Sequence, residues 1–192
     1  PASARLAILG LASVAFYASW SVAYLPVLLG VIVVAFVGGR QLERKAGTGR
    51  DLLALWLVIL LLTLPLLYFK YWNWLSGDFE RAMAGLGWQV DLKQSSLALP
   101  IGISFFTFQA IAYVVDVRRG TRAEWNLWRF GTFIAFFPQL VAGPIVRAGQ
   151  LLPQLHLLPL LQSGQVGAGL YRIGRGLFKK LLIADVLRVA IV

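Results

Sequence analysis

The sequence predicts an all-α protein that crosses a membrane several times. Of its 192 residues, 59% are hydrophobic and the mean hydropathy is +0.75, whereas a soluble domain is about 45–50% apolar. The apolar residues gather in runs, and about 20 helical residues are enough to cross the hydrocarbon core of a bilayer. One apolar run, residues 130–146, contains Pro138 and the pair Gly143-Pro144. Because proline removes a backbone donor and clashes with the preceding turn, we expect this run to be broken or re-entrant.

Irregular backbone at membrane depth is tolerated only where it is packed inside protein or lines a watery cavity. The broken run therefore predicts an internal path or site. We expect a single membrane domain over residues 1–192, with spans near 6–20, 24–39, 52–69, 97–115, 130–146 and 177–192. The first break should fall at Ser19-Trp20-Ser21, with Pro26 in the first turn of the second helix. Residues 70–95 should form an outside loop that includes a short interfacial helix at 78–88.

Basic residues outnumber acidic ones by 18 to 8, which gives a net charge of +10. Most of them lie between apolar runs, as in residues 40–50 and 116–129. This pattern is typical of loops that face the cytoplasm and contact anionic lipid headgroups. The sequence contains no cysteine, which excludes disulfides and Cys-based metal sites. No nucleic-acid-binding module is recognisable, so nucleic acid is not an expected partner. The chain begins with Pro1 and ends within an apolar run, so we expect it to be a piece of a longer protein.

Few residues are candidates for chemistry. His156 is the single histidine, and its ordinary pKa near neutrality makes it the obvious candidate general base. No acidic residue lies within ten positions to orient it, so we favour a structural role for His156. A metal site is not expected, because neither a second histidine nor a cysteine is present. The Gly-rich basic stretch 164–180 is not a phosphate loop, since Arg175 and Gly176 occupy the positions of the required Lys and Ser or Thr.

Polar side chains within the apolar runs have two interpretations. Ser104, Thr107 and Gln109 could face a substrate path, but helix–helix packing is the more common role of such residues. For Asp116, an ion pair with neighbouring arginines at a helix end is favoured over catalysis. Arg172, Arg175 and Lys179 share one face of the expected last helix, residues 165–192. The first half of this helix should lie at the cytoplasmic surface, and the second half should enter the bilayer or the protein core.

Three motifs carry a resemblance to a known family. They are LPIGISFFTFQAIAYVVDVRRG (99–120), FFPQLVAGPIVRAGQLLPQL (136–155) and GLFKKLLIADVL (176–187). Together they resemble the membrane-bound O-acyltransferase (MBOAT) family, and most of all its bacterial polysaccharide branch, typified by the alginate O-acetylation membrane protein. The motif AGPIVR, rather than the SGPID-like motif of teichoic acid D-alanyl transfer proteins, favours transfer of an acetyl group. The chain is similar to the N-terminal half of such an enzyme.

The resemblance implies an O-acyltransferase in the bacterial inner (plasma) membrane that crosses it several times. It would move an acetyl group from a cytoplasmic donor, acetyl-CoA or another acyl thioester, towards hydroxyls of an exported, alginate-like polysaccharide. No bound cofactor or metal is implied. The family's catalytic histidine is expected after Val192, so His156 is not assigned that role. The implied partners are membrane lipids and periplasmic or membrane proteins of polysaccharide acetylation.

The same resemblance assigns two groups of residues. The substrate path would be formed by Gln109, Pro138, Gln139, Gly143, Pro144 and Arg147. Lys179 and Lys180 would lie at the donor entrance, although interaction with lipid headgroups explains these lysines equally well.

Two other functions stay open. A transporter or flippase without acyl chemistry would need intramembrane charges or paired half-helices related by a repeat, and the sequence shows neither. A non-catalytic membrane scaffold could instead recruit a periplasmic transferase. Transfer of label from acetyl-CoA would separate the acyltransferase from both alternatives.

Overall fold

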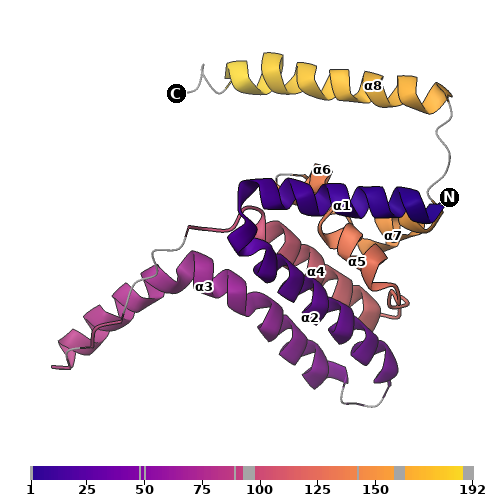
Figure 1. Cartoon of the computed structure of the whole chain (residues 1–192). Coiled ribbons are helices and arrows are strands. Elements are labelled where there is room, and N and C mark those ends of the chain that lie inside the picture. The colour runs from indigo at the N-terminus through magenta and orange to yellow at the C-terminus, as the bar shows by residue number, and fades with distance from the viewer. Residues whose placement is uncertain are drawn as a thin grey trace. The chain divides into compact units, whose positions relative to one another are not determined.

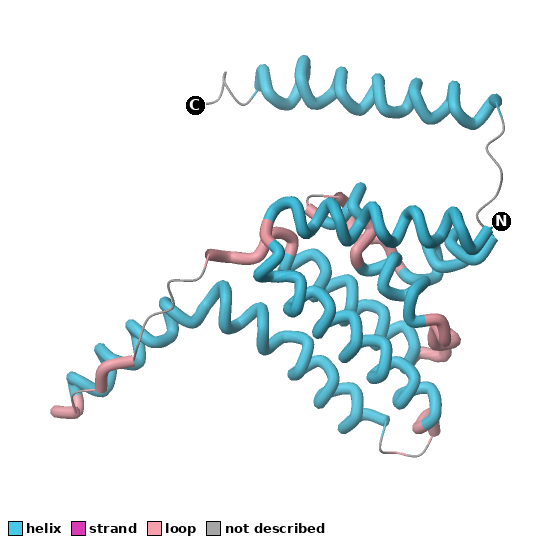
Figure 2. Tube along the Cα trace, in the orientation of Figure 1, coloured by secondary structure: helices cyan, strands magenta, loops and turns pink. Residues whose placement is uncertain are grey.

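The computed structural model describes residues 2–47, 49, 51–88, 90–92, 98–141, 143–157 and 163–187. Every regular element in these ranges is a helix, as Figures 1 and 2 show. The chain divides into two units, Pro1–Leu158 and Pro159–Val192, and each is described by itself. The prediction of an all-α protein is confirmed.

The first two long helices are separated where the sequence predicts. Helix α1 (Ala2–Trp20) ends at the expected tryptophan, and Ser21 is extended, with φ −166°. A short 3-10 turn, η1 (Val22–Tyr24), then leads into α2 (Leu25–Arg44). Pro26 lies in the first turn of α2, where its missing N–H has no helical acceptor to lose.

Helix α3 (Asp51–Gly85) is much longer than the expected span at 52–69. The prediction of a loop from residue 70, with a separate short helix at 78–88, was wrong over the described residues. Between Phe69 and Gly85 the chain has no proline and only one internal glycine, Gly77, so little interrupts the helix. Pro65 lies inside α3, and Figure 1 shows the helix changing direction along its length, with its second half extending away from α2 and α4.

Helices α2, α3 and α4 (Ile103–Arg118) form a three-helix layer. Glycines in α2 bring the helices close together: a Cβ on Gly38 would lie 2.6 Å from Val58 of α3, and one on Gly39 would lie 2.6 Å from Tyr113 of α4. Small residues at such contacts are typical of membrane helix packing. Helix α4 begins later than the expected span at 97–115, because residues 98–102 are not helical and Gly102 has φ 72°. Leu97 lies outside the described residues.

The segment expected to be broken is broken. Helix α5 (Leu127–Ile134) is followed by the single turn α6 (Phe137–Leu140), by non-helical residues 143–147 and by α7 (Ala148–Leu157). Helix α1 packs on both α5 and α6, and α5 also contacts α2 and α7. The interrupted segment thus lies between the N-terminal helix and the three-helix layer.

Within the described ranges, three helical stretches are long and apolar enough to cross a membrane: Ser3–Trp20, Val22–Arg44 and Asp51–Gly85. Large apolar side chains remain exposed along them, among them Leu29, Val33, Trp56 and Leu60. Such extensive apolar exposure is expected of surfaces that face lipid. Together with the helical architecture, these features make the chain a polytopic membrane protein.

The second unit is one continuous helix over its described residues. Helix α8 (Ser163–Phe178) runs into a π-helical segment (Lys179–Ala184), and the residue after it, Asp185, donates its backbone N–H to the carbonyl of Lys180. The helix expected at 165–192 is therefore present as far as residue 187. Residues 188–192 lie outside the described part of the chain.

Candidate functional site

Near the end of helix α5, the backbone carbonyl of Phe133 does not accept the hydrogen bond that a continuing helix would supply. In a continuing helix the Phe133 carbonyl would accept from the N–H of Phe137, but that N–H lies 3.4 Å from Ser13 Oγ, to which it donates. Two side-chain amides replace it: Gln109 Nε2 donates to the Phe133 oxygen at 3.1 Å and Gln139 Nε2 donates at 3.3 Å. Both glutamines are buried. The break is therefore stabilised by polar groups supplied from α4 and α6.

Two glycines allow the backbone to pack tightly around α6. A Cβ on Gly143 would lie 2.4 Å from the Cα of Gln139. A Cβ on Gly102 would lie 2.4 Å from the carbonyl oxygen of Leu140, and its φ of 72° is one that favours glycine. The role of Gly143 in the broken segment was expected from the sequence, whereas that of Gly102 was not.

Burial differs between the two halves of the broken segment. Phe130, Phe133 and Ile134 are fully buried, as is most of α5's inner face. In contrast, Pro138 and Pro144 are exposed and Gly143 is half-buried. Of the six residues expected along a substrate path, Gln109 and Gln139 are therefore brought together in the interior, and the prolines lie at the surface of the described chain.

Arg147, the last of these six residues, lies outside the buried part of the segment. Its side chain is 67% exposed, and its Nη1 is 3.8 Å from Oδ1 of Asp116 at the end of α4. The sequence neighbour Arg118 instead pairs with Asp51, with Nε–Oδ2 at 3.1 Å. Asp116 thus forms an ion pair at a helix end, but the prediction that its partner is a neighbouring arginine was wrong, because the partner is Arg147.

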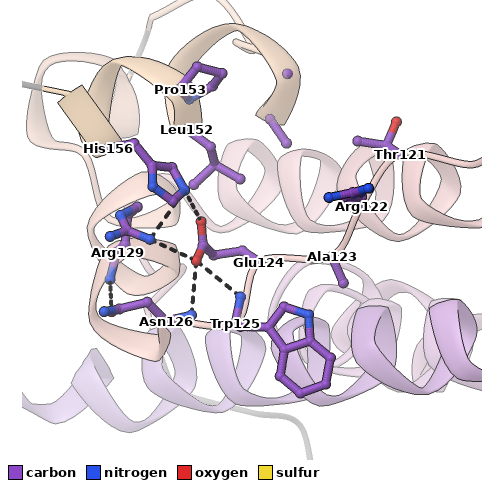
Figure 3. A pocket seen from close by; sticks show the side chains of 12 residues that line it. Thr121, Arg122, Ala123, Glu124, Trp125, Asn126, Arg129, Leu152, Pro153 and His156 are labelled. Atoms are coloured by element: carbon purple, nitrogen blue, oxygen red, sulfur yellow. Dashed lines mark hydrogen bonds and ion pairs between the residues drawn. The ribbon is translucent and has the colours of Figure 1, made fainter.

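The first unit also contains an open recess of about 680 Å³ (Figure 3). It is formed by the segment between α4 and α5, by the start of α5 and by α7. Its lining residues are Thr121, Arg122, Ala123, Glu124, Trp125, Asn126, Arg129, Ala148, Gly149, Leu152, Pro153 and His156.

Glu124 is the centre of the polar contacts in this recess. Its Oε1 accepts from the backbone N–H groups of Trp125 and Asn126, at 3.0 and 2.9 Å, and from Arg129 Nη1 at 3.0 Å. Its Oε2 lies 3.0 Å from His156 Nε2, and its side chain is only 6% exposed. A carboxylate placed before the first turn of α5 also interacts favourably with the helix dipole. Glu124 therefore joins α7 to the beginning of α5.

The contacts of His156 define what its imidazole can do. Nε2 lies 3.0 Å from Glu124 Oε2 and 3.2 Å from Arg129 Nη1. Nε2 thus faces an acceptor, the Glu124 carboxylate, and a donor, the Arg129 guanidinium; it donates to Glu124 when it carries a proton and accepts from Arg129 when it does not. The side chain is half-exposed in the recess. This is a carboxylate-oriented imidazole, an arrangement suited to proton transfer, although its first effect is to hold two helices together.

Sequence reasoning missed this cluster because its members are far apart along the chain. Glu124 and His156 are separated by 32 positions, beyond the ten positions in which an acidic partner was sought. One local signal was present: Asn126 caps α5 by accepting from Arg129 N at 2.9 Å, and Glu124 stands two residues before it. An acidic residue next to an N-cap predicts a structured turn, but it does not identify the histidine.

Cation–π contacts also hold the segment between α4 and α5, at Trp125. The guanidinium of Arg40 lies 4.1 Å from the ring centroid of Trp125, and that of Arg44 lies 5.6 Å away. The backbone N–H of Ala123 donates to Glu43 Oε1 at 3.1 Å. The C-terminal end of α2 therefore meets the segment that precedes α5, and the two basic loops expected in the cytoplasm lie on the same side of the protein.

The lysines expected at a donor entrance lie in the second unit. Lys179 and Lys180 begin the π-helical segment, and Lys180 Nζ is 3.9 Å from Asp185 Oδ2. Their proposed contact with an acyl donor stays a prediction. Within the described residues, no group of three or more His, Cys, Asp or Glu side chains is arranged to hold a metal ion.

Comparison with known proteins identifies related sequences. An alginate O-acetylase (AlgI) of Pseudomonas syringae pv. tomato, so named as probable, is 36% identical over 192 residues, which is 96% of this chain and 36% of that protein. A peptidoglycan O-acetyltransferase of Helicobacter pylori is 32% identical over 204 residues, covering 91% of this chain and 37% of that protein. The chain is MBOAT-like. The resemblance of its three motifs to this family is thereby confirmed.

The MBOAT-like chain spans about a third of the length of these curated relatives, less than the half expected from its motifs. A teichoic acid D-alanyltransferase of Lacticaseibacillus rhamnosus matches a smaller part, with 32% identity over 59 residues, or 31% of this chain. No family model matches the chain, and no solved structure matches it.

Proposed function

We propose that this chain is part of a membrane-bound O-acyltransferase that moves an acetyl group from a cytoplasmic donor towards hydroxyls of an exported polysaccharide. The observation that carries the proposal is the identity of 32–36% to proteins named alginate O-acetylase and peptidoglycan O-acetyltransferase, over more than nine-tenths of the chain. These relatives are named for different polymers. More specifically, we propose that the acceptor is an alginate-like polysaccharide and that the protein lies in a bacterial inner membrane.

The broken segment supports a conduit rather than a simple anchor. Burial of Phe133, and capping of its carbonyl by Gln109 and Gln139, hold irregular backbone inside protein, which is where such backbone is tolerated at membrane depth. In this proposal the two glutamines fix the wall of the conduit. Gly143 allows its close turn, and the exposed residues Pro144 and Arg147 lead to its cytoplasmic mouth, where Arg147 meets Asp116 at the end of α4. Pro138 belongs to the turn that approaches Gly102 at the start of α4, and so lies towards the opposite end.

The donor would be acetyl-CoA or another acyl thioester, and it would approach the basic side of the protein. Arg40, Arg122 and Arg129 supply positive charge there, which favours an anionic donor. The histidine that the family uses as a catalyst is expected outside residues 1–192. His156 is therefore proposed to position α7 against α5, and the chemistry of acyl transfer is assigned to no residue of this chain.

Label transfer tests the proposal directly. Membranes that contain the full-length protein, with the polysaccharide and its export partners, are given acetyl-CoA labelled in the acetyl group. The expected result is alkali-labile label on the polymer, which is the behaviour of an O-acetyl ester. Export of unlabelled polymer would instead favour a transporter or flippase. If label transfer persisted when this protein was absent but its partners were present, the protein would be a scaffold at most.

A further inference from the structure

The first part of α8 is a strongly two-sided helix. Val166, Leu170, Ile173 and Leu177 recur at intervals of four, three and four residues, so they form one stripe along an α-helix. Arg172, Arg175 and Lys179 recur at intervals of three and four residues, and at 100° per residue they fall on the opposite side. The apolar and basic stripes are thus segregated over residues 163–179, which the structure describes as helical.

The charged side chains in the described part of this unit are mostly basic. Residues 163–187 contain four basic side chains and a single acidic one, Asp185. Asp185 lies 3.9 Å from Lys180, which is outside the basic stripe. The stripe of Arg172, Arg175 and Lys179 is therefore not neutralised by the acidic residue in the described part of its own unit.

The first part of α8 is unsuited to cross a bilayer. Glycines, a glutamine and two arginines interrupt its apolar residues, and α8 is not among the helices of the described residues that are long and apolar enough to span. A helix with a basic face, an apolar face and few apolar residues overall lies instead in the plane of the membrane–water interface. At that depth the apolar stripe reaches the acyl chains while the basic stripe meets lipid phosphates.

From these features we infer that residues 163–179 form an interfacial helix that binds anionic phospholipid on the cytoplasmic side of the membrane. Its ligand is the phosphate-bearing surface of the leaflet, contacted by Arg172, Arg175 and Lys179. Beyond Lys180 the sequence becomes apolar, and the π-helical segment adds one residue to a turn, which changes the angular phase of the helix where its composition changes. The inference requires only that the chain is a membrane protein and does not depend on acetyl transfer.

The depth of each stripe can be measured, because the chain has no cysteine of its own. Leu170→Cys and Leu177→Cys place an environment-sensitive fluorophore on the apolar stripe. Ala168→Cys, on the basic side, is the matched control. In nanodiscs of phosphatidylcholine and phosphatidylglycerol, labels at 170 and 177 should be quenched by nitroxide lipids, whereas the label at 168 should be quenched by aqueous iodide. If all three labels were shielded from both quenchers, the helix would be packed inside protein and the inference would be overturned.

A second experiment tests whether docking of this helix depends on anionic lipid. Each basic residue near an anionic surface strengthens docking by about 5-fold, so replacing all three stripe residues with glutamine should weaken it by about 100-fold. A charge-conserving variant, Arg172→Lys with Arg175→Lys and Lys179→Arg, should dock like the parent. Quenching at 170 that was equal in pure phosphatidylcholine and in the anionic mixture would refute a role for lipid phosphate charge.

Discussion

Replacing Gln109 and Gln139 with leucine tests how the broken segment is held together. The two amides donate to the same acceptor, the Phe133 carbonyl, at 3.1 and 3.3 Å. Leucine preserves much of the side-chain volume and removes the donor. Either single variant leaves one amide on the carbonyl, whereas the double variant leaves a buried acceptor without a side-chain donor.

The expected energies follow from this sharing. Each single replacement should lower the free energy of unfolding by about 0.5–1.5 kcal/mol, the net value of one hydrogen bond. A buried polar group without a partner costs about 1–3 kcal/mol, so the double variant should lose more than the sum of the singles. We expect a coupling energy of about 1 kcal/mol, within the range of residues that share a partner.

The assay is equilibrium unfolding of the 192-residue chain in mixed micelles, by titration with sodium dodecyl sulfate and detection of tryptophan fluorescence. Gln154→Leu is the matched control. Gln154 is exposed on α7, and its Nε2 donates to the Gln150 carbonyl of the same helix at 2.9 Å. The control should change stability by less than about 0.5 kcal/mol. Strictly additive losses, or a control as destabilising as the buried singles, would refute the shared-cap reasoning.

Three further outcomes follow from the packing and the polar cluster. Gly102→Ala should destabilise the chain by about 1–3 kcal/mol in the same titration, because Gly102 has a positive φ and lies close to the Leu140 carbonyl. The control Gly30→Ala, in open space within α2, should leave the free energy of unfolding unchanged or raise it by up to about 1 kcal/mol. Glu124→Gln should lose about 1.5–3 kcal/mol, against less than about 1 kcal/mol for Asp78→Asn, whose ion pair is exposed; equal losses would contradict the central role of Glu124. His156→Gln in the full-length protein should retain label transfer within about 10-fold, since loss of a general base typically costs at least about 100-fold. A drop of that larger size would make His156 catalytic.

The positions of the helix breaks could be predicted from single residues. The break after Trp20, the start of α2 around Pro26 and the interruption near Pro138 and Gly143 all depend on local backbone chemistry. Such effects act over one helical turn, so the sequence shows them directly. The continuation of α3 to Gly85 was not predicted, because aromatic and charged residues suggested an interface where the backbone contains no strong helix breaker.

Contacts between distant segments could not be predicted in the same way. Nothing in the residues around Gln109 and Gln139 indicates that their amides meet at one carbonyl, since that depends on how α4 packs against the end of α5. The pairing of Glu124 with His156 has the same origin. A polar residue in an apolar run predicts some partner, and only the packing determines which one.

The segment between α4 and α5 owes its shape to groups that come from elsewhere. Ala123 N–H donates to Glu43 of α2, and Glu124 N–H donates at 3.0 Å to the hydroxyl of Tyr113 in α4. Both acceptors are in place only when α2 and α4 have associated, so we expect these hydrogen bonds to depend on the packing of the two helices rather than on the local sequence. The amide protons of Ala123 and Glu124 should therefore exchange slowly with deuterium while the helical layer is intact, and should lose this protection in variants that separate α2 from α4.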